Sequence, residues 1–310
     1  MRLQLPNEYI FATMLLVVSS QLPAQRSVEM RRAVTPTASI RIMGSFADLR
    51  IRGWDKDSVA ITGTIPADAR FNGGFLSADK TSSPGAKFYL ETASGVPAGK
   101  LELRVPAGAR VWAKSGSATI DVEGVSGGLD LNIIGGSVVV RGRPHDVVVE
   151  SMDGNVSMDG TPSYLRLKTA TGDIAVTGGG EDAGLTTISG SIRVAAGRFE
   201  RARMESVTGT VVFGAEIAPG GALDVDTHSG AIDLLVPRTM SADYDIATVS
   251  GTIENTLTNR PAVPGREGRG QEIGFTTGTG GARVYVRSFK GNVRVAPAPN
   301  VAGKVQIKVF

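Results

Sequence analysis

The most informative absence in this 310-residue chain is cysteine, which does not occur at all. A chain without cysteine has no disulfide framework, no thiolate metal site, no cysteine nucleophile and no N-terminal cysteine to carry a lipid. Histidine is almost as scarce, since the sequence has only His145 and His228, and this leaves little choice for a catalytic triad. The stability of the fold must therefore come from packing, and a large regular core is expected.

The chain also lacks dense runs of charge. It has 33 lysines and arginines against 30 aspartates and glutamates, for a net charge of +3, and aromatic residues make up only 5% of it. The basic residues are dispersed and are not interleaved with aromatics, which argues against nucleic acid as a partner. Glycine is abundant, with 40 residues. Because a glycine in a helix interior costs about 1 kcal/mol relative to alanine, this abundance favours strands joined by many tight turns.

Residues 1–25 have the features of a secretory signal peptide. Arg2 supplies a positive charge, residues 10–18 form a short apolar run, and Leu22–Ala24 could precede a cleavage site. The apolar run is shorter than the roughly 20 residues that cross a bilayer, and no later segment could span one. We expect an exported protein, located in the periplasm, in the cell envelope or outside the cell, whose mature form begins near Gln25. Retention of the segment as an N-terminal anchor is the alternative.

A short phrase recurs along the chain: a small or polar residue, a glycine, a polar residue and then alternating apolar residues. It occurs as IIGGSVVV, SMDGNVSM, TATGDIAV, TISGSIRV, SVTGTVVF, THSGAIDL, TVSGTIEN and SFKGNVRV. The marker glycines are Gly136, Gly154, Gly172, Gly190, Gly209, Gly230, Gly251 and Gly291. They are 18, 18, 18, 19, 21, 21 and 40 residues apart, and the last interval suggests one coil that has lost its marker. Such a period indicates stacked repeats that share one core.

Aligning the repeats on the marker glycine produces columns of apolar residues. They stand two and four positions after the glycine and two, five and seven positions before it, and only His228 and Asn255 break them. The column two positions before the glycine contains Ile134, Met152, Ala170, Ile188, Val207, His228, Val249 and Phe289. We expect all five columns to be buried in two short strands per repeat. The marker glycine should lie at positive φ in the turn between the strands, and a second small residue marks the other turn: Gly142, Gly160, Gly178, Ala196 or Ala215.

These patterns predict an all-β fold, a parallel β-solenoid built from coils of 18–21 residues. An antiparallel β-sandwich or meander would show the same alternation and is the alternative. Residues 26–37 are expected to form a linker after the signal peptide, and residues 38–310 to form one β-strand repeat domain. Within it we expect capping strands over 38–108, the repeats over 109–255, a loop over 256–270 and C-terminal strands over 271–310.

Carboxylates gather at one place on the predicted polar face. If neighbouring coils pair in register, Glu205 lies beside Asp226, with Asp224 and Asp245 close by. Such a patch is either a calcium site or, as we expect, a solvated acidic face. His145 is expected at a solvated turn, and His228 is either a partly exposed histidine or a pH switch. We therefore assign no catalytic, cofactor-binding or metal-binding residue.

Three phrases resemble a known family. RGWDKDSVAI, LELRVPAGARV and the serial glycine units are similar to sequences of the bacterial putative-adhesin family of β-strand repeat proteins. The resemblance covers roughly residues 38–310. It implies an exported or envelope-attached protein with a domain of unknown function, and it supplies no catalytic residues to transfer.

Together these observations predict a non-catalytic scaffold of the envelope or the extracellular space, with an adhesin-like binding role. Its partner would be an unidentified envelope polymer or protein, and we expect no cofactor. A regulatory component of the envelope-stress response is the alternative. A carbohydrate-active β-helix enzyme is a further, less favoured alternative. Coils of 18–21 residues leave little room for the loops that flank a catalytic groove, and only the turn at Gly178–Asp182 has spare length inside the array.

Overall fold

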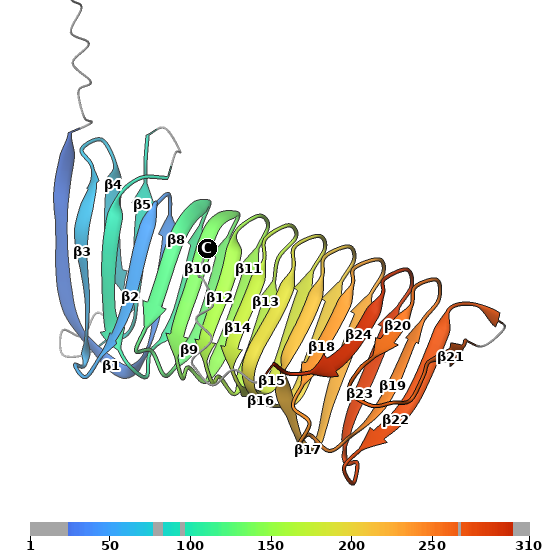
Figure 1. The fold of residues 1–310 in the computed structure, drawn as a ribbon. Coiled ribbons are helices and arrows are strands. Elements are labelled where there is room, and N and C mark those ends of the chain that lie inside the picture. Colours follow the sequence, from blue (N-terminus) through green and yellow to red (C-terminus); the bar gives the residue numbers. More distant parts are fainter. Residues whose placement is uncertain (1–23, 77–82, 94–96, 266–267, 300–310) are drawn as a thin grey trace, which may run out of the picture.

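The computed structural model describes residues 24–76, 83–93, 97–265 and 268–299, and within these ranges it consists of β-strands and turns without an α-helix (Figure 1). The strands stack into an elongated solenoid with two faces. Strands of successive coils pair in parallel, for example β10 with β12 and β11 with β13. This confirms the predicted parallel solenoid over the antiparallel sandwich or meander.

The strands fall into three groups along the chain. The N-terminal group contains β1 (Gln25–Gly44), β2 (Asp48–Trp54), β3 (Ser58–Pro66), β4 (Arg70–Phe75), β5 (Ser83–Glu91) and β6 (Lys100–Pro106). The regular array contains β7 (Arg110–Ser115), β8 (Ser117–Glu123), β9 (Gly128–Ile133), β10 (Gly135–Gly142), β11 (Asp146–Ser151), β12 (Asn155–Gly160), β13 (Tyr164–Lys168), β14 (Ile174–Gly178), β15 (Gly180–Thr187), β16 (Ile192–Ser206), β17 (Val211–Thr227) and β18 (Ile232–Val236). The C-terminal group contains β19 (Ala242–Thr248), β20 (Ile253–Asn255), β21 (Val263–Pro264), β22 (Gln271–Thr277), β23 (Ala282–Ser288) and β24 (Val293–Pro297).

Each coil places one strand on each face. Face 1 of the array contains β7, β9, β11, β13, β15 and the C-terminal halves of β16 and β17. Face 2 contains β8, β10, β12, β14, the N-terminal halves of β16 and β17, and β18. A tight turn at the marker glycine joins face 1 to face 2 within a coil, and a wider turn leads to face 1 of the next coil.

Four of the five predicted apolar columns form the core between the two faces. Val138 pairs with Val156, and Ile174 with Ile192, in one unbroken row, and each of these side chains is at most 2% exposed. Alternate residues point to opposite sides of a strand, so every second residue reaches this core. Neighbouring coils bury one another, as the repeat pattern predicts.

The fifth column was predicted wrongly. The side chains two positions before the marker glycine are not buried, and most of them are about half exposed. The reason is that they follow the last inward residue of the face 1 strand by one position, so the strand's alternation directs them outward.

The reason for the marker glycine also differs from the prediction. Of the marker glycines, Gly136 has a positive φ, of 99°, but Gly172 and Gly190 do not. A Cβ on Gly190 would lie 2.0 Å from the carbonyl oxygen of Gly172 in the preceding coil. The glycine is therefore required by the close approach of stacked backbones. Positive φ belongs to the other turn, where Gly142 has a φ of 122° and Gly178 one of 114°.

The order of coils in space differs from their order in the sequence at the C-terminal end. β23 pairs in parallel with both β17 and β19, and β24 pairs with both β18 and β20. The last coil is thus inserted between two earlier ones, as Figure 1 shows for β18, β24 and β20. The 40-residue interval before Gly291 consequently contains the β21–β22 excursion, in which β22 covers β19 in antiparallel orientation, and not a coil without a marker.

The N-terminal end is built in the same way. The C-terminal half of β1 pairs with β5 and β7, and β2 pairs with β6 and β8. The first coil of the chain is therefore enclosed between the coil of β5 and β6 and the coil of β7 and β8. Both terminal coils are held on two sides by parallel ladders, so fraying at either end requires two ladders to break.

The prediction of a linker over residues 26–37 was also wrong, because these residues belong to β1. Residues 25–33 pair antiparallel with β3, and Val28 and Val34 are buried. The segment covers a sheet edge that would otherwise be open to other chains. The predicted loop over 256–270 contains the two-residue strand β21, and C-terminal strands lie within 271–299. The predicted signal segment up to residue 23 and the part of the C-terminal region beyond residue 299 lie outside the described residues.

Candidate functional site

The outward residues of the tight turns form a line of mostly apolar side chains, which we call the turn ridge. In spatial order it consists of Ile134, Met152, Ala170, Ile188, Val207, His228, Phe289 and Val249. The exposed fraction is 57% for Ile134 and Met152, 56% for Ile188, 46% for Phe289, 45% for Val249 and 43% for Val207. Most of the large exposed apolar side chains of the described residues therefore lie on one edge of the solenoid.

Hydroxyl groups hold the turns that carry the ridge. The residue three positions before the marker glycine is serine or threonine in most coils, and its hydroxyl accepts a hydrogen bond from the glycine N–H. The distance is 2.8 Å from Gly209 N to Ser206 Oγ and 3.1 Å from Gly190 N to Thr187 Oγ1. These hydroxyls are buried, so each satisfies a backbone donor that would otherwise be unpaired. Because the hydroxyl residue and the glycine recur in most coils, the ridge residues stack in register.

Backbone hydrogen bonds fix the ridge along its length. Met152 N donates to Ile134 O at 3.1 Å, and Ile188 N donates to Ala170 O at 3.1 Å. Near the C-terminal end, the rings of His228 and Phe289 stack with centroids 5.1 Å apart. Seven inter-coil steps of about 4.8 Å give the ridge a length of about 34 Å.

A groove lies where the ridge meets the C-terminal group. It has a volume of about 720 Å³ and is lined by ridge residues His228, Phe289 and Val249 together with Arg269 and Glu272. Polar and apolar groups therefore meet at this end of the ridge.

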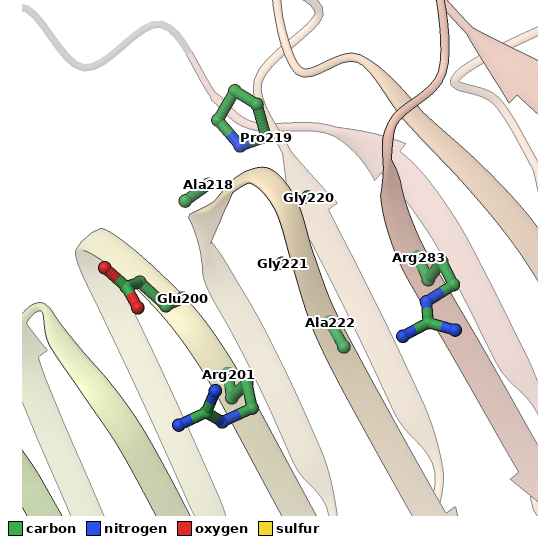
Figure 2. A pocket seen from close by; sticks show the side chains of 8 residues that line it. All are labelled: Glu200, Arg201, Ala218, Pro219, Gly220, Gly221, Ala222 and Arg283. Atoms are coloured by element: carbon green, nitrogen blue, oxygen red, sulfur yellow. The ribbon is translucent and has the colours of Figure 1, made fainter.

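Two smaller hollows lie on face 1, near the wider turns. One, of about 390 Å³, is lined by Glu200, Arg201, Arg283 and the small residues Gly221 and Ala222 (Figure 2). The second, of about 220 Å³, shares Arg201 and Ala222 with the first. The two hollows are therefore adjacent, and together their lining residues extend from β13 to β23.

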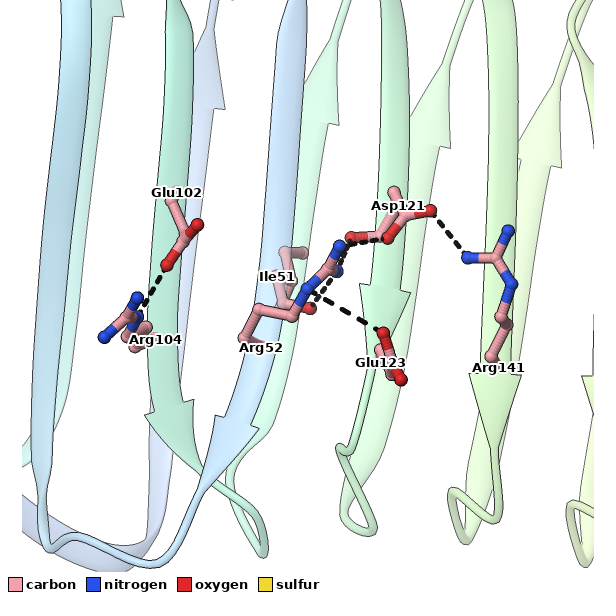
Figure 3. A network of polar contacts seen from close by, with 7 residues as sticks. All are labelled: Ile51, Arg52, Glu102, Arg104, Asp121, Glu123 and Arg141. Atoms are coloured by element: carbon pink, nitrogen blue, oxygen red, sulfur yellow. Dashed lines mark hydrogen bonds and ion pairs between the residues drawn. The ribbon is translucent and has the colours of Figure 1, made fainter.

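A charged network ties the N-terminal coil into the array (Figure 3). Arg52 on β2 places Nη2 2.6 Å from Asp121 Oδ1, and Arg141 on β10 places Nη1 2.6 Å from Asp121 Oδ2. Burial by itself would raise the pKa of Asp121, but the hydrogen bonds from Arg141 and Arg52 outweigh burial and hold that pKa below its usual range. A carboxylate shared by the arginines of both neighbouring coils stabilises the stack and is not arranged for proton transfer.

The predicted acidic patch forms only in part. Glu205 and Asp226 are register partners on adjacent strands, as predicted. Asp226 is followed on its other side by Arg287, whose Nη2 lies 3.0 Å from Asp245 Oδ2. The inserted coil thus places an arginine, Arg287, among the acidic residues of the predicted patch. Within the described residues, no group of three or more histidine, aspartate or glutamate side chains is placed to hold a metal ion.

The two histidines lie apart. His145 is exposed at a wide turn, with Nδ1 2.7 Å from Asp146 Oδ1, and His228 belongs to the exposed ridge. Sequence reasoning missed the ridge because it assigned those residues to the core. It missed the face 1 hollows because Arg283 reaches Ala222 only through the inserted coil.

No helix within the described ranges is of a length and apolarity that could cross a membrane. A comparison with curated proteins found no match. Among solved structures, the chain is similar to a putative adhesin from Parabacteroides distasonis, at 14% identity and a TM-score of 0.48, over 87% of this chain and 97% of that one. A putative adhesin from Bacteroides fragilis is similar at 13% identity and a TM-score of 0.39, over 88% and 98%. A putative lipid binding protein from Parabacteroides distasonis is similar at 12% identity and a TM-score of 0.41, over 87% and 96%.

The match to a protein family spans most of the chain. Residues 34–296 match the family described as Toastrack DUF4097. This range contains both terminal groups of strands as well as the repeat array, and it agrees with the resemblance that the repeat phrases indicated. The chain therefore belongs to the Toastrack DUF4097 family, whose domain has no established function.

Proposed function

We propose that this protein is an exported, non-catalytic scaffold with an adhesin-like role, which attaches to a component of the cell envelope through its turn ridge. The observation that carries the proposal is the ridge itself, a line of eight turn residues in register, six of which are large apolar side chains about half exposed. Contiguous exposed apolar surface on a folded protein marks an interaction site.

The fold does not require these residues to be apolar. Ala170 and His228 occupy the same turn position as Ile134 and Met152, so the turn accepts small and polar side chains. The stabilising contacts of the turn come from the buried hydroxyl and the marker glycine. Large apolar side chains at this position therefore bring no evident benefit to folding, and contact with a partner explains them.

A static binding role also fits the charges on face 1. Arg166 Nη2 lies 2.8 Å from Asp182 Oδ1, and Arg203 is paired with Glu205 on its own strand. Ion pairs of this kind hold the charged side chains in fixed positions, as expected for a rigid binding surface. The secretory-signal features of residues 1–25 in the sequence support export.

The ridge can be tested by replacing Ile134, Met152 and Ile188 together with serine. The wild-type protein should sediment with envelope fragments prepared from the native host. The ridge variant should lose at least about tenfold in retention, because the three removed side chains are the most exposed apolar side chains of the ridge. Circular dichroism should show that the variant is folded, since none of the three side chains is in the core.

A matched control replaces Leu76, Tyr164 and Val263, which are exposed apolar residues away from the ridge, with serine. This variant should sediment like the wild type. If the ridge variant also sediments like the wild type, the ridge is not the contact and the proposed function is wrong.

A further inference from the structure

We propose that the two hollows on face 1 form one trough that binds an acidic polysaccharide, laid along the solenoid axis. The trough is defined by Arg166, Gly184, Arg201, Arg203, Ala222 and Arg283. It is separate from the turn ridge, and the proposal does not depend on the ridge binding any partner.

The trough exists because small residues interrupt two rows of long side chains. In one row Arg201 pairs with Ala222, and Ala222 with Arg283. In the other row Gly184 stands between Arg166 and Arg203. The short side chain of Ala222 leaves floor space between Arg201 and Arg283. At Gly184 the side chain of Arg166 lies across the backbone, where an added Cβ would be 2.8 Å from Arg166 Cδ. From β13 to β23 the trough crosses four inter-strand steps, about 19 Å, which suits an extended chain of several sugar rings.

Two of the arginines are available to an incoming anion. Arg283 has no ion pair or side-chain hydrogen bond within the described part of the chain, and Arg201 has only a 3.6 Å contact, from its Nη2 to Asp182 Oδ2, with 64% of its side chain exposed. Both residues line the hollow that contains Ala222, from the strands on either side of it (Figure 2). A guanidinium binds a carboxylate through two parallel hydrogen bonds. The hollow is therefore suited to a carboxylate group.

Other arginines of this face are already held in position. The guanidinium of Arg166 lies 4.2 Å from the ring centroid of Tyr164 at one end of the trough. That of Arg287, on β23 but outside the trough, lies 3.6 Å from the ring centroid of Tyr285. Such stacking on an aromatic ring orders the guanidinium before a ligand arrives. A preordered site loses less side-chain entropy on binding.

Acidic residues in the same trough select among polyanions. Glu200, Asp182 and Asp224 line the hollows together with the arginines. These carboxylates repel a polymer that has only phosphates along its backbone, whereas they accept hydrogen bonds from hydroxyl groups. A ligand that carries both acid groups and hydroxyl groups satisfies both sets of residues, and an acidic sugar chain has this chemistry.

The test uses a fluorescein-labelled oligogalacturonate and its methyl ester, which has the same backbone without the charges. By fluorescence polarisation the wild type should bind the acid and not the ester, and Arg201→Ala and Arg283→Ala should each weaken binding by about tenfold or more. Arg193→Ala is the matched control, because Arg193 is exposed on the same strand as Arg201 but on face 2. It should bind like the wild type.

Ala222→Leu separates a shaped site from loose electrostatic attraction, since it fills the floor and keeps every charge. This variant should also lose binding, whereas the ridge variant should bind the oligogalacturonate with wild-type affinity. The proposal is overturned if the wild type does not bind the acid, if the ester or a single-stranded DNA oligonucleotide binds equally well, or if Ala222→Leu has no effect.

Discussion

Replacing Ile192 with aspartate is expected to unfold the solenoid in part or to reduce its stability by more than any surface change. Ile192 is fully buried in the row between Ile174 and Val211. Losing a buried isoleucine side chain removes roughly 1.5–3 kcal/mol, and a carboxylate left unpaired among apolar side chains costs several kcal/mol more. Chemical denaturation followed by circular dichroism measures the loss.

The neighbouring residue is the control for this substitution. Arg193 is exposed, and its register partners Ala175 and Val212 lie on the same outer side of the sheet, where Val212 is 8% exposed. Arg193→Asp should therefore change the free energy of unfolding by no more than about 0.5 kcal/mol. An equal or larger loss for Arg193→Asp would show that the assignment of faces is wrong.

Adding a single methyl group at Gly190 should be almost as disruptive, because the methyl group would collide with the backbone of the preceding coil. The new Cβ would lie 2.0 Å from the carbonyl oxygen of Gly172, and backbone atoms cannot move away without breaking the ladder between the coils. Overpacking of this kind costs about 1–3 kcal/mol. Urea denaturation of Gly190→Ala should show a loss at the upper end of that range.

Gly116 provides the comparison, since it stands in a tight turn of the first regular coil and a Cβ there meets no atom within 4 Å. Gly116→Ala should be neutral, or should stabilise the fold by about 0.4–1 kcal/mol through the lower entropy of the unfolded chain. If both substitutions have the same effect, close stacking does not explain the marker glycines.

The repeat pattern was sufficient to predict the solenoid and most of its core. Val138, Val156 and Ile174 alternate with polar residues and recur at a fixed distance from a glycine, so their common row follows from the two-residue period of a strand. The same two-residue period also predicts that the ridge residues are exposed. Positions seven, five and three before the glycine share one side of the strand, and the third of these is serine or threonine in most coils. Position two must therefore face outward, as Met152 does.

The order of the coils could not be predicted from the same pattern. Every coil presents the same alternation to its neighbours, so β23 matches β19 and β17 equally well by sequence, and register patterns do not distinguish between them. The placement of Arg283 beside Ala222 and of Phe289 beside His228 depends on this order. Likewise, residues 26–37 of β1 were predicted as a linker because their polar residues obscure the apolar residues Val28 and Val34, which are buried where β3 and β5 pair with β1.

The insertion of the last coil therefore determines both proposed binding surfaces, and cysteine cross-linking tests it directly in a chain that has no other cysteine. Asp224, Tyr285 and Asp245 occupy one outward row in that order. Adjacent strands are about 4.8 Å apart, within the Cα separation of about 4.4–6.8 Å that a disulfide can bridge. Oxidised double variants, analysed by peptide mass spectrometry, should contain a disulfide for D224C with Y285C and for Y285C with D245C, and none for D224C with D245C. A disulfide between positions 224 and 245, with none to position 285, would show that the coils follow sequence order. That result would contradict the insertion of the last coil between two earlier ones.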